Sequence, residues 1–318
     1  MRRAGVIALA VAALAVLPAW GQAPPAPPAD DESAVVQELE VIARPPGPAM
    51  WRVRRGDAEV AILGAVSPIP HSVVWDPSRF QRMMEGANAV LLQAPFRPNA
   101  VEMLGLLVRV QKLRTSSKLE AGLPPDLRAR FVAARTAAGK DEGRYAHWKP
   151  QVAGFLVLSD VRRARNLSEA KPGSTVRRMA KTAKVPVRDV GDYKFGSIAG
   201  AFANLSPEAS RECLADALSQ VDAEAVHAEP AAKAWAAGDL KGVRADYTAA
   251  ELDRCLLQLR NYNQVLETTT ADWVKAVNAA LAKPGKNVAV IDLRLLLRAN
   301  GVLDRLKAEG AEISVPLE

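Results

Sequence analysis

Apolar and polar residues alternate along "MWRVRRGDAEVAILGAV" (50–66), and the alternation is interrupted at Arg55-Gly56-Asp57. A period of two residues on either side of a glycine turn predicts a β-hairpin whose second strand ends in a turn at Gly64. The segment 77–86 predicts a helix, and the apolar run "ANAVLLQAPF" (87–96) predicts a buried strand. Further strands are predicted at "VPVRDV" (185–190), "NVAVIDL" (287–293) and "AEISVPL" (311–317).

The middle of the chain has helical periodicity instead. Apolar residues recur three or four positions apart from Asn99 to about Val185 and, with breaks, from Pro207 to Leu281. Ser206 before Pro207 is typical of a helix N-terminus, and a last helix is predicted at 301–310. The strands therefore cluster near both ends. This order predicts an α/β fold with a sheet built from N- and C-terminal strands, and a helical insertion (about 97–285) that forms a cap.

The two strand-rich ends resemble each other. "VAILGAVSPIP" (60–70) and "NVAVIDLRLLL" (287–297) are both apolar strands that run into a turn, and each is followed by a helix and another strand. Units of this kind often place two turns side by side at one end of a sheet, where a pocket forms. Coincidence remains the alternative.

The N-terminus indicates export. Arg2 and Arg3 precede an apolar run to about Leu17, and small residues flank Trp20, which together predict a signal peptide over 1–21. An uncleaved anchor is the alternative, and no lipobox cysteine follows. Residues 22–48 form a Pro/Ala-rich acidic linker, and 49–318 form the folded domain. We expect a periplasmic or secreted protein.

Two cysteines, Cys213 and Cys255, lie in helical segments without a CxxC pair. In an oxidising compartment they predict one disulfide between two helices, with two buried thiols as the alternative.

Positive charge is concentrated in one region. The chain has a formal net charge of +7, and nine basic residues but one acid lie between Arg162 and Arg188. Arg177, Lys181 and Lys184 fall on one helix face. This face is either simply solvated or a docking face for a lipid head group or acidic polysaccharide, which would allow peripheral membrane contact. Export argues against nucleic acid as a partner.

Four segments carry a resemblance to a known family: "PAMWRVRRGDAEVAILGAVSPIP", "ANAVLLQAP", "RNYNQ" (260–264) and "NVAVIDL…GVLDRLKAEGAEI". In the order of its elements, Ala49 to Glu318 resembles the TraB/GumN family of exported bacterial proteins, related to the Tiki metalloproteases. The resemblance implies a Tiki- and erythromycin-esterase-like mixed sheet. It also implies two GxxH turns, an acid at a strand end and an Arg-Asn pair. The histidines and the acid would bind a divalent metal, whose bound water attacks a peptide or similar bond.

This sequence departs from that pattern at each metal position. Ser67 replaces the first histidine, Gln93 the acid and Leu295 the second histidine, and Asp292 replaces a glycine. A hydroxyl, a neutral amide and an alkyl group cannot compensate a divalent cation for its dehydration. We therefore expect no metal, no cofactor and no catalytic residue. The candidate binding pocket comprises Gly64, Ser67, Gln93, Arg260, Asn261 and Asp292.

The sequence offers little support for a different metal site or a different catalytic nucleophile. His71, His147 and His227 lie in no metal-binding motif, and Ser67 lacks a GxSxG elbow. Asp292 is expected to pair with Arg294 or Arg260. Three functions stay open: an inactive relative that binds a periplasmic partner or anionic ligand, a hydrolase of metal-independent mechanism that uses Ser67, His71, Asp292 or Arg260, and a purely structural envelope domain.

Overall fold

The structure is a computed structural model that describes residues 47–95, 103, 105, 108, 110–191, 202–247, 253–259 and 262–316. The signal peptide and all of the linker up to residue 46 lie outside the described residues. The last two linker residues, Gly47 and Pro48, are buried. Gly47 has a φ of +90° and lies so close to the carbonyl of Asp76 that a Cβ would come within 2.8 Å of its oxygen.

A six-stranded mixed sheet in the order β6-β4-β7-β2-β1-β8 forms the centre of the fold. Its strands are β1 (Met50–Arg55), β2 (Ala58–Ala65), β4 (Val90–Gln93), β6 (Val187–Val190), β7 (Gly285–Asp292) and β8 (Glu312–Ser314). β1 is antiparallel to both β2 and β8, whereas β2, β7, β4 and β6 are parallel. The predicted hairpin and the sheet built mainly from the two ends of the chain are thus confirmed.

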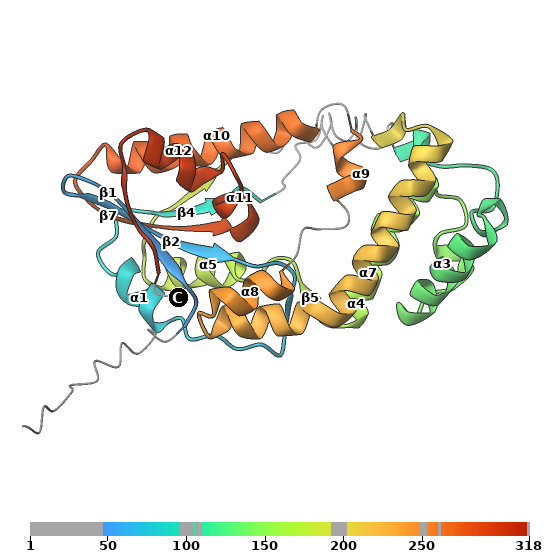
Figure 1. The fold of residues 1–318 in the computed structure, drawn as a ribbon, viewed down its shortest axis with the longest axis horizontal. Helices are drawn as coiled ribbons and strands as arrows, with labels where there is room; N and C mark the ends of the chain where they lie inside the picture. Colours follow the sequence, from blue (N-terminus) through green and yellow to red (C-terminus); the bar gives the residue numbers. More distant parts are fainter. Residues whose placement is uncertain are drawn as a thin grey trace, which may run out of the picture. The chain divides into compact units, whose positions relative to one another are not determined.

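Helices lie on both faces of this sheet (Figure 1). On one side are α10 (Tyr262–Leu281), α11 (Leu293–Leu297) and α12 (Val302–Ala308). On the other are α1 (Ser78–Met84), α5 (Gly173–Thr182), α8 (Leu240–Asp246) and the end of α7 (Pro207–Ala236). Burial on both faces explains why β2 and β7 are continuous apolar runs.

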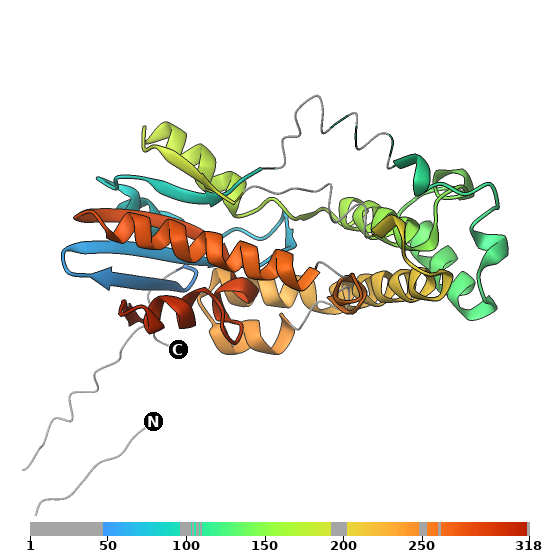
Figure 2. The same cartoon turned by 90° about the horizontal axis from the view of Figure 1, so that it is seen from above.

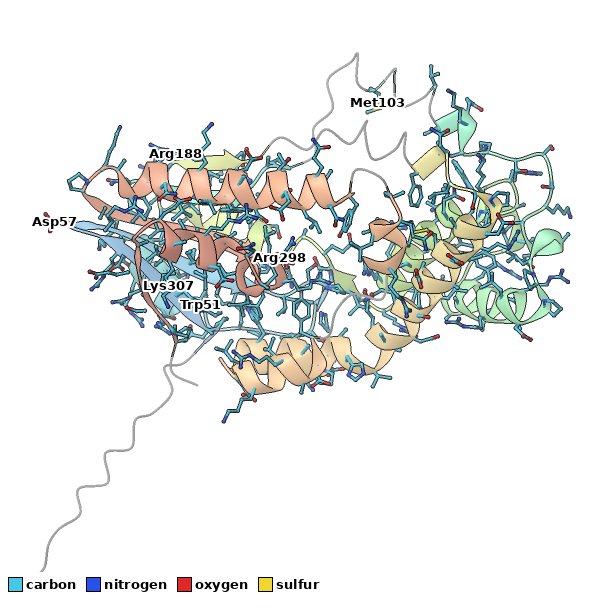
Figure 3. All side chains as sticks on the ribbon, turned by 45° about the horizontal axis from the view of Figure 1, so that its top comes forward. Trp51, Asp57, Met103, Arg188, Arg298 and Lys307 are labelled. Atoms are coloured by element: carbon cyan, nitrogen blue, oxygen red, sulfur yellow. A yellow bond between two sulfur atoms is a disulfide. The ribbon has the colours of Figure 1, made fainter. Side chains whose placement is uncertain are left out.

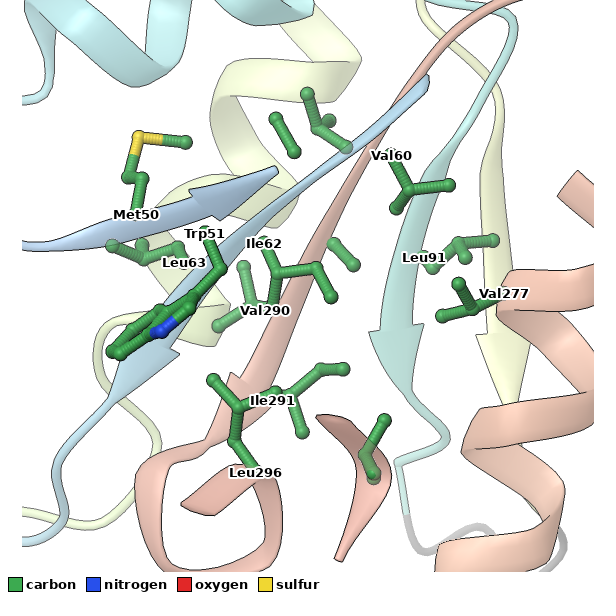
Figure 4. Packing of buried hydrophobic residues seen from close by; sticks show 14 of the residues in the cluster. Met50, Trp51, Val60, Ile62, Leu63, Leu91, Val277, Val290, Ile291 and Leu296 are labelled. Atoms are coloured by element: carbon green, nitrogen blue, oxygen red, sulfur yellow. The ribbon is translucent and has the colours of Figure 1, made fainter. Parts of the chain in front are cut away.

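The sheet core packs around residues from both ends of the chain (Figure 4). Trp51, Ile62 and Ile291 are at most 2% exposed, as are many of their neighbours. In the same cluster, Leu91 of β4 lies beside Val277 of α10 (Figure 4). The N- and C-terminal segments therefore share one hydrophobic core rather than two.

A second core lies between helices. It is formed by α3 (Pro125–Ala137), α4 (Pro150–Ala164) and the first half of α7, together with Tyr145. Short 3-10 turns at Glu120–Gly122 and Glu142–Arg144 complete this part. A separate two-stranded sheet pairs β3 (Ile69–Pro70) with β5 (Leu167–Ser168), and its Ile69 belongs to the core of the six-stranded sheet.

The helices with their own core span a narrower range than the cap expected at 97–285. Val176 of α5, Val190 of β6 and Trp273 of α10 fall within that range but belong to the core of the sheet. The sequence pattern identified the helices but could not show which of them pack on strands.

Helix α7 contributes to both cores, with Leu214 in one and Trp235 in the other. It begins as predicted, with Ser206 Oγ accepting a hydrogen bond from the Ala209 amide at 3.1 Å. In Figures 1 and 2 the helix changes direction along its course, and Pro230 in its second half lacks the N–H needed for a continuous ladder. The predicted disulfide joins Cys213 of α7 to Cys255 of α9 (Asp253–Leu257).

We predict that reduction of this disulfide lowers the free energy of unfolding by about 2–4 kcal/mol, because the bond closes a loop between residues 42 apart in sequence. Guanidinium unfolding with and without dithiothreitol measures the change. The Cys213→Ser/Cys255→Ser variant is the control and should not respond to the reductant. Equal midpoints of the wild type in both conditions would contradict the prediction.

One buried carboxylate anchors the helical core. Asp160 of α4 is 2% exposed and accepts hydrogen bonds from Arg144 Nε and Tyr145 Oη, each at 2.9 Å, and from Arg163 at 3.0 Å. Burial opposes its ionisation, but these hydrogen bonds and the charges of Arg144 and Arg163 outweigh burial. The pKa of Asp160 is therefore held below its ordinary value.

Because that pKa is lowered by folding, Asp160 should stabilise the protein above the usual aspartate range, and this contribution should be lost as the pH falls through the folded-state pKa. We expect Asp160→Asn to lower the free energy of unfolding by about 1–3 kcal/mol at pH 7. Urea unfolding of both proteins from pH 7 to pH 3 tests this expectation. A difference that stays constant down to pH 3 would show that the charge is not responsible.

Candidate functional site

The two predicted turns lie side by side. Strands β2 and β7 are paired along their whole length, from Ala58 opposite Gly285 to Ala65 opposite Asp292. Their carboxyl ends, and the residues that follow, therefore meet at one edge of the sheet, next to the end of β4. This confirms the arrangement that the similarity between the two strand-turn units predicted.

Gly64 is required for close packing. A Cβ at this position would lie 2.6 Å from both Leu293 Cδ1 and Trp51 Cζ3. Its carbonyl accepts a hydrogen bond of 2.6 Å from Trp235 Nε1, and the ring of Trp235 lies 5.5 Å from that of Trp75. The space beneath the first turn is thus filled by aromatic side chains.

Tyr247, which follows α8, connects the two turns. Its hydroxyl oxygen accepts a hydrogen bond from the Ser67 amide at 3.2 Å and lies 3.4 Å from Asp292 Oδ2, to which it can donate. The guanidinium of Arg294 lies 4.8 Å from the centre of the Tyr247 ring. Burial and the negative charge of Asp292 raise the pKa of Tyr247, so the phenol stays neutral and retains the proton that it donates.

Asp292 acts as a helix cap. Its Oδ1 accepts hydrogen bonds from the amides of Arg294 at 2.9 Å and Leu295 at 3.4 Å, which begin α11. The Arg294 Nε lies 3.7 Å from the same oxygen, so the expected pairing with Arg294 is present. The alternative partner, Arg260, lies outside the described residues, as does Asn261.

The other three replaced positions are also held by contacts within the protein. The Gln93 amide donates to the Val190 carbonyl at 2.9 Å, and its oxygen accepts from Trp273 Nε1 at 3.1 Å. Leu295 packs against the sheet core, and Ser67 Oγ donates to the carbonyl of Glu169 at 3.3 Å. Each of these side chains thus makes a hydrogen bond or a packing contact with a neighbouring segment of the chain.

This donor set does not fit the divalent metal that the family resemblance implies. A hydroxyl and an amide that already hydrogen-bond to backbone carbonyls, and an alkyl group that cannot donate electrons, are poor ligands for a hard or borderline cation. Across the described part of the chain, no three His, Cys, Asp or Glu side chains gather in a way that could hold a metal ion.

A cavity of about 40 Å³ lies beside Ser67, and its described lining includes Tyr247, Arg294 and residues of α7. This volume holds a few water molecules. His227 of α7 also lines it, and His227 Nδ1 lies 2.9 Å from Asp246 Oδ1. Sequence reasoning missed this histidine–aspartate pair, because the two residues are separated by the end of α7.

In the predicted docking face, Arg177 is engaged within the protein, whereas the two lysines are exposed to solvent. Arg177 pairs with Asp189 at 2.6 Å and donates to the Gln93 carbonyl at 3.4 Å, so it braces β4 and β6. Lys181 and Lys184 are exposed, as is Arg188 on β6 (Figure 3).

Other contacts of the site could not be predicted. Tyr247 and Trp273 are far from Ser67 and Gln93 in sequence, and neither belongs to a motif. Their only sequence signal is an aromatic residue in a helical segment, which is more often part of the core.

If Gln93 is held by its two hydrogen bonds, Gln93→Glu should destabilise the protein by about 1–3 kcal/mol at pH 7, because a carboxylate cannot donate to the Val190 carbonyl. The loss should shrink at acidic pH, where the protonated carboxyl can donate. Thermal unfolding between pH 7 and pH 4 measures both effects. Gln93→Met, which removes both hydrogen bonds without adding charge, is the control and should show a loss that is independent of pH. A Gln93→Glu variant as stable as the wild type would contradict this account.

The profile of the TraB/PrgY/gumN family matches residues 49–315. No curated protein and no solved structure matches the chain significantly. No helix in the described ranges is long and apolar enough to cross a membrane. Since the family profile covers the hairpin, the helical segment and both strand-turn units, the chain belongs to the TraB/PrgY/gumN family.

Proposed function

We propose that this protein is an exported member of the TraB/PrgY/gumN family that has lost metal-dependent hydrolysis and binds an anionic component of the cell envelope or a periplasmic protein. The observation that carries the proposal is the state of the three replaced positions. Ser67, Gln93 and Leu295 are neutral, and the contacts of each hold together the surrounding turns and strands. A site of this kind is suited to structural support rather than to activation of water.

Two features support export. The N-terminal residues have the pattern of a signal peptide, and the Cys213–Cys255 disulfide is typical of proteins in an oxidising compartment. Binding of an anion is supported by the formal net charge of +7, by exposed Lys181 on α5 and by exposed Lys184, which lies just beyond the end of that helix.

A metal-independent hydrolase is the second candidate. It is favoured by the cavity that Ser67 shares with His227, whose Nδ1 is oriented by Asp246 as in a catalytic triad. Against it, Ser67 Oγ donates to the Glu169 carbonyl, and within the described residues no hydrogen bond joins Ser67 to His227. A serine without a base in contact remains a weak nucleophile, so we prefer the binding function.

We predict that the mature protein, dialysed after exposure to Mn²⁺, Co²⁺ or Zn²⁺, retains less than one equivalent of metal in elemental analysis. It should also show no peptidase or esterase activity that a chelator abolishes. One retained equivalent that is lost in Asp292→Ala would overturn the proposal. A chelator-resistant activity that is lost in Ser67→Ala would instead establish the second candidate.

A further inference from the structure

A basic groove lies on the sheet face that carries α1, towards the amino ends of β2 and β7. Cross-strand register places Arg52 opposite Ala61, Arg54 opposite Glu59 and Glu59 opposite Lys286. Directly paired residues point to the same face of a sheet. Charged side chains of three neighbouring strands are therefore gathered on one face, in place of the apolar side chains that cover a core.

Helix α1 completes the groove. Phe80 and Met84 are its buried residues, whereas Arg79 and Arg82, three positions apart, share another face. Arg79 and Arg82 line a cavity of about 570 Å³ with Arg52, Glu59 and Lys286. A second cavity of about 240 Å³ shares Arg52 and Arg79 with the first and extends to Arg54 and Ser314. These volumes are in the range of small-molecule sites.

The charges in the groove are not balanced. The described residues that line the two cavities include five cations (Arg52, Arg54, Arg79, Arg82 and Lys286) and one anion (Glu59). Glu59 is engaged by Arg54 at 2.7 Å and by Arg52 at 3.7 Å.

Arg79 and Arg82 are left unpaired: neither forms an ion pair or hydrogen bond with a described residue. Arg82 interacts with Asp76 only through its charge, and Asp76 Oδ1 accepts a hydrogen bond from the Ser78 amide at 2.9 Å.

The crowding of these cations is unfavourable without a ligand. Burial, followed by the charges of Arg52 and Arg82, lowers the pKa of Arg79 below its ordinary value. A multivalent anion would relieve this repulsion and could receive paired N–H donors from each guanidinium. A single carboxylate would neutralise only one of the excess charges.

We propose that the groove between α1 and strands β1, β2 and β7 is a binding site for a compact phosphate-bearing ligand with at least two negative charges, held by Arg79 and Arg82 with Arg52 and Lys286. The groove lies at the opposite ends of β2 and β7 from Ser67 and Asp292. Anion binding in this groove is therefore independent of the proposed loss of hydrolysis, and a negative pyrophosphate titration would leave the result of the metal analysis unchanged.

The test uses inorganic pyrophosphate as the probe and the mature protein at low ionic strength. Isothermal titration calorimetry should detect binding that weakens as salt is added. Arg79→Gln/Arg82→Gln should weaken binding at least about tenfold, because charge-assisted contacts are lost. Without pyrophosphate, this variant should melt no lower than the wild type, since it removes unpaired cations.

The control is Lys140→Gln/Lys307→Gln, which removes the same charge from exposed positions outside the groove, Lys307 being on α12 (Figure 3). Its affinity should stay within about twofold of the wild type if the site is local, because distant surface charges are screened by salt. Absence of pyrophosphate binding, or an equal loss in both double variants, would overturn the proposal.

Sedimentation with phosphatidylglycerol vesicles distinguishes the sources of the phosphate. Vesicle binding that pyrophosphate competes away, and that Arg79→Gln/Arg82→Gln abolishes, supports the site and identifies a lipid head group. Pyrophosphate binding without vesicle binding supports the site and identifies a soluble ligand. Vesicle binding that is unaffected by both treatments, together with no calorimetric signal, assigns membrane contact to another surface and contradicts the proposal.

Discussion

The parallel pairing of β2 with β7 is the constraint on which the rest of the structure depends. The two strands come from opposite ends of the folded domain, and all eight residues of β2 are paired with β7. This pairing closes one core around both ends of the chain. It also fixes two edges of the sheet at once: the turns that carry Ser67 and Asp292 at the carboxyl ends, and the charged residues Glu59 and Lys286 at the amino ends.

At the carboxyl ends, contacts within the protein hold the residues of the two turns and of the end of β4. Tyr247 is hydrogen-bonded to Ser67 and lies within hydrogen-bonding distance of Asp292. Trp273 and the Val190 carbonyl hold both ends of the Gln93 amide. Buried polar groups need hydrogen-bond partners, and here other parts of the protein supply them. The edge of the sheet is therefore held by internal contacts, and its donors suit a divalent cation poorly.

Local sequence patterns predicted the elements better than the contacts between them. Alternation around Gly56 indicated the hairpin, Ser206 and Pro207 marked the start of α7, and Cys213 and Cys255 form the expected disulfide. Each of these features depends on neighbouring residues or on a rare residue type. By contrast, Tyr247 lies 180 residues from Ser67, and the groove combines α1 with three strands. Such contacts depend on tertiary packing and leave no periodic signal, so the sequence could not show that α5, β6 and α10, within the range expected for the cap, pack into the core of the sheet.

The central claim is that the edge of the sheet near Ser67, Gln93 and Asp292 is held by internal hydrogen bonds and cannot bind a divalent cation. Anomalous diffraction from crystals soaked in Mn²⁺ tests it most directly. The account predicts no anomalous peak within bonding distance of these three side chains, with the Gln93 amide still between Trp273 and Val190. A peak coordinated by any of them, with Gln93 or Asp292 turned towards the ion, would contradict it.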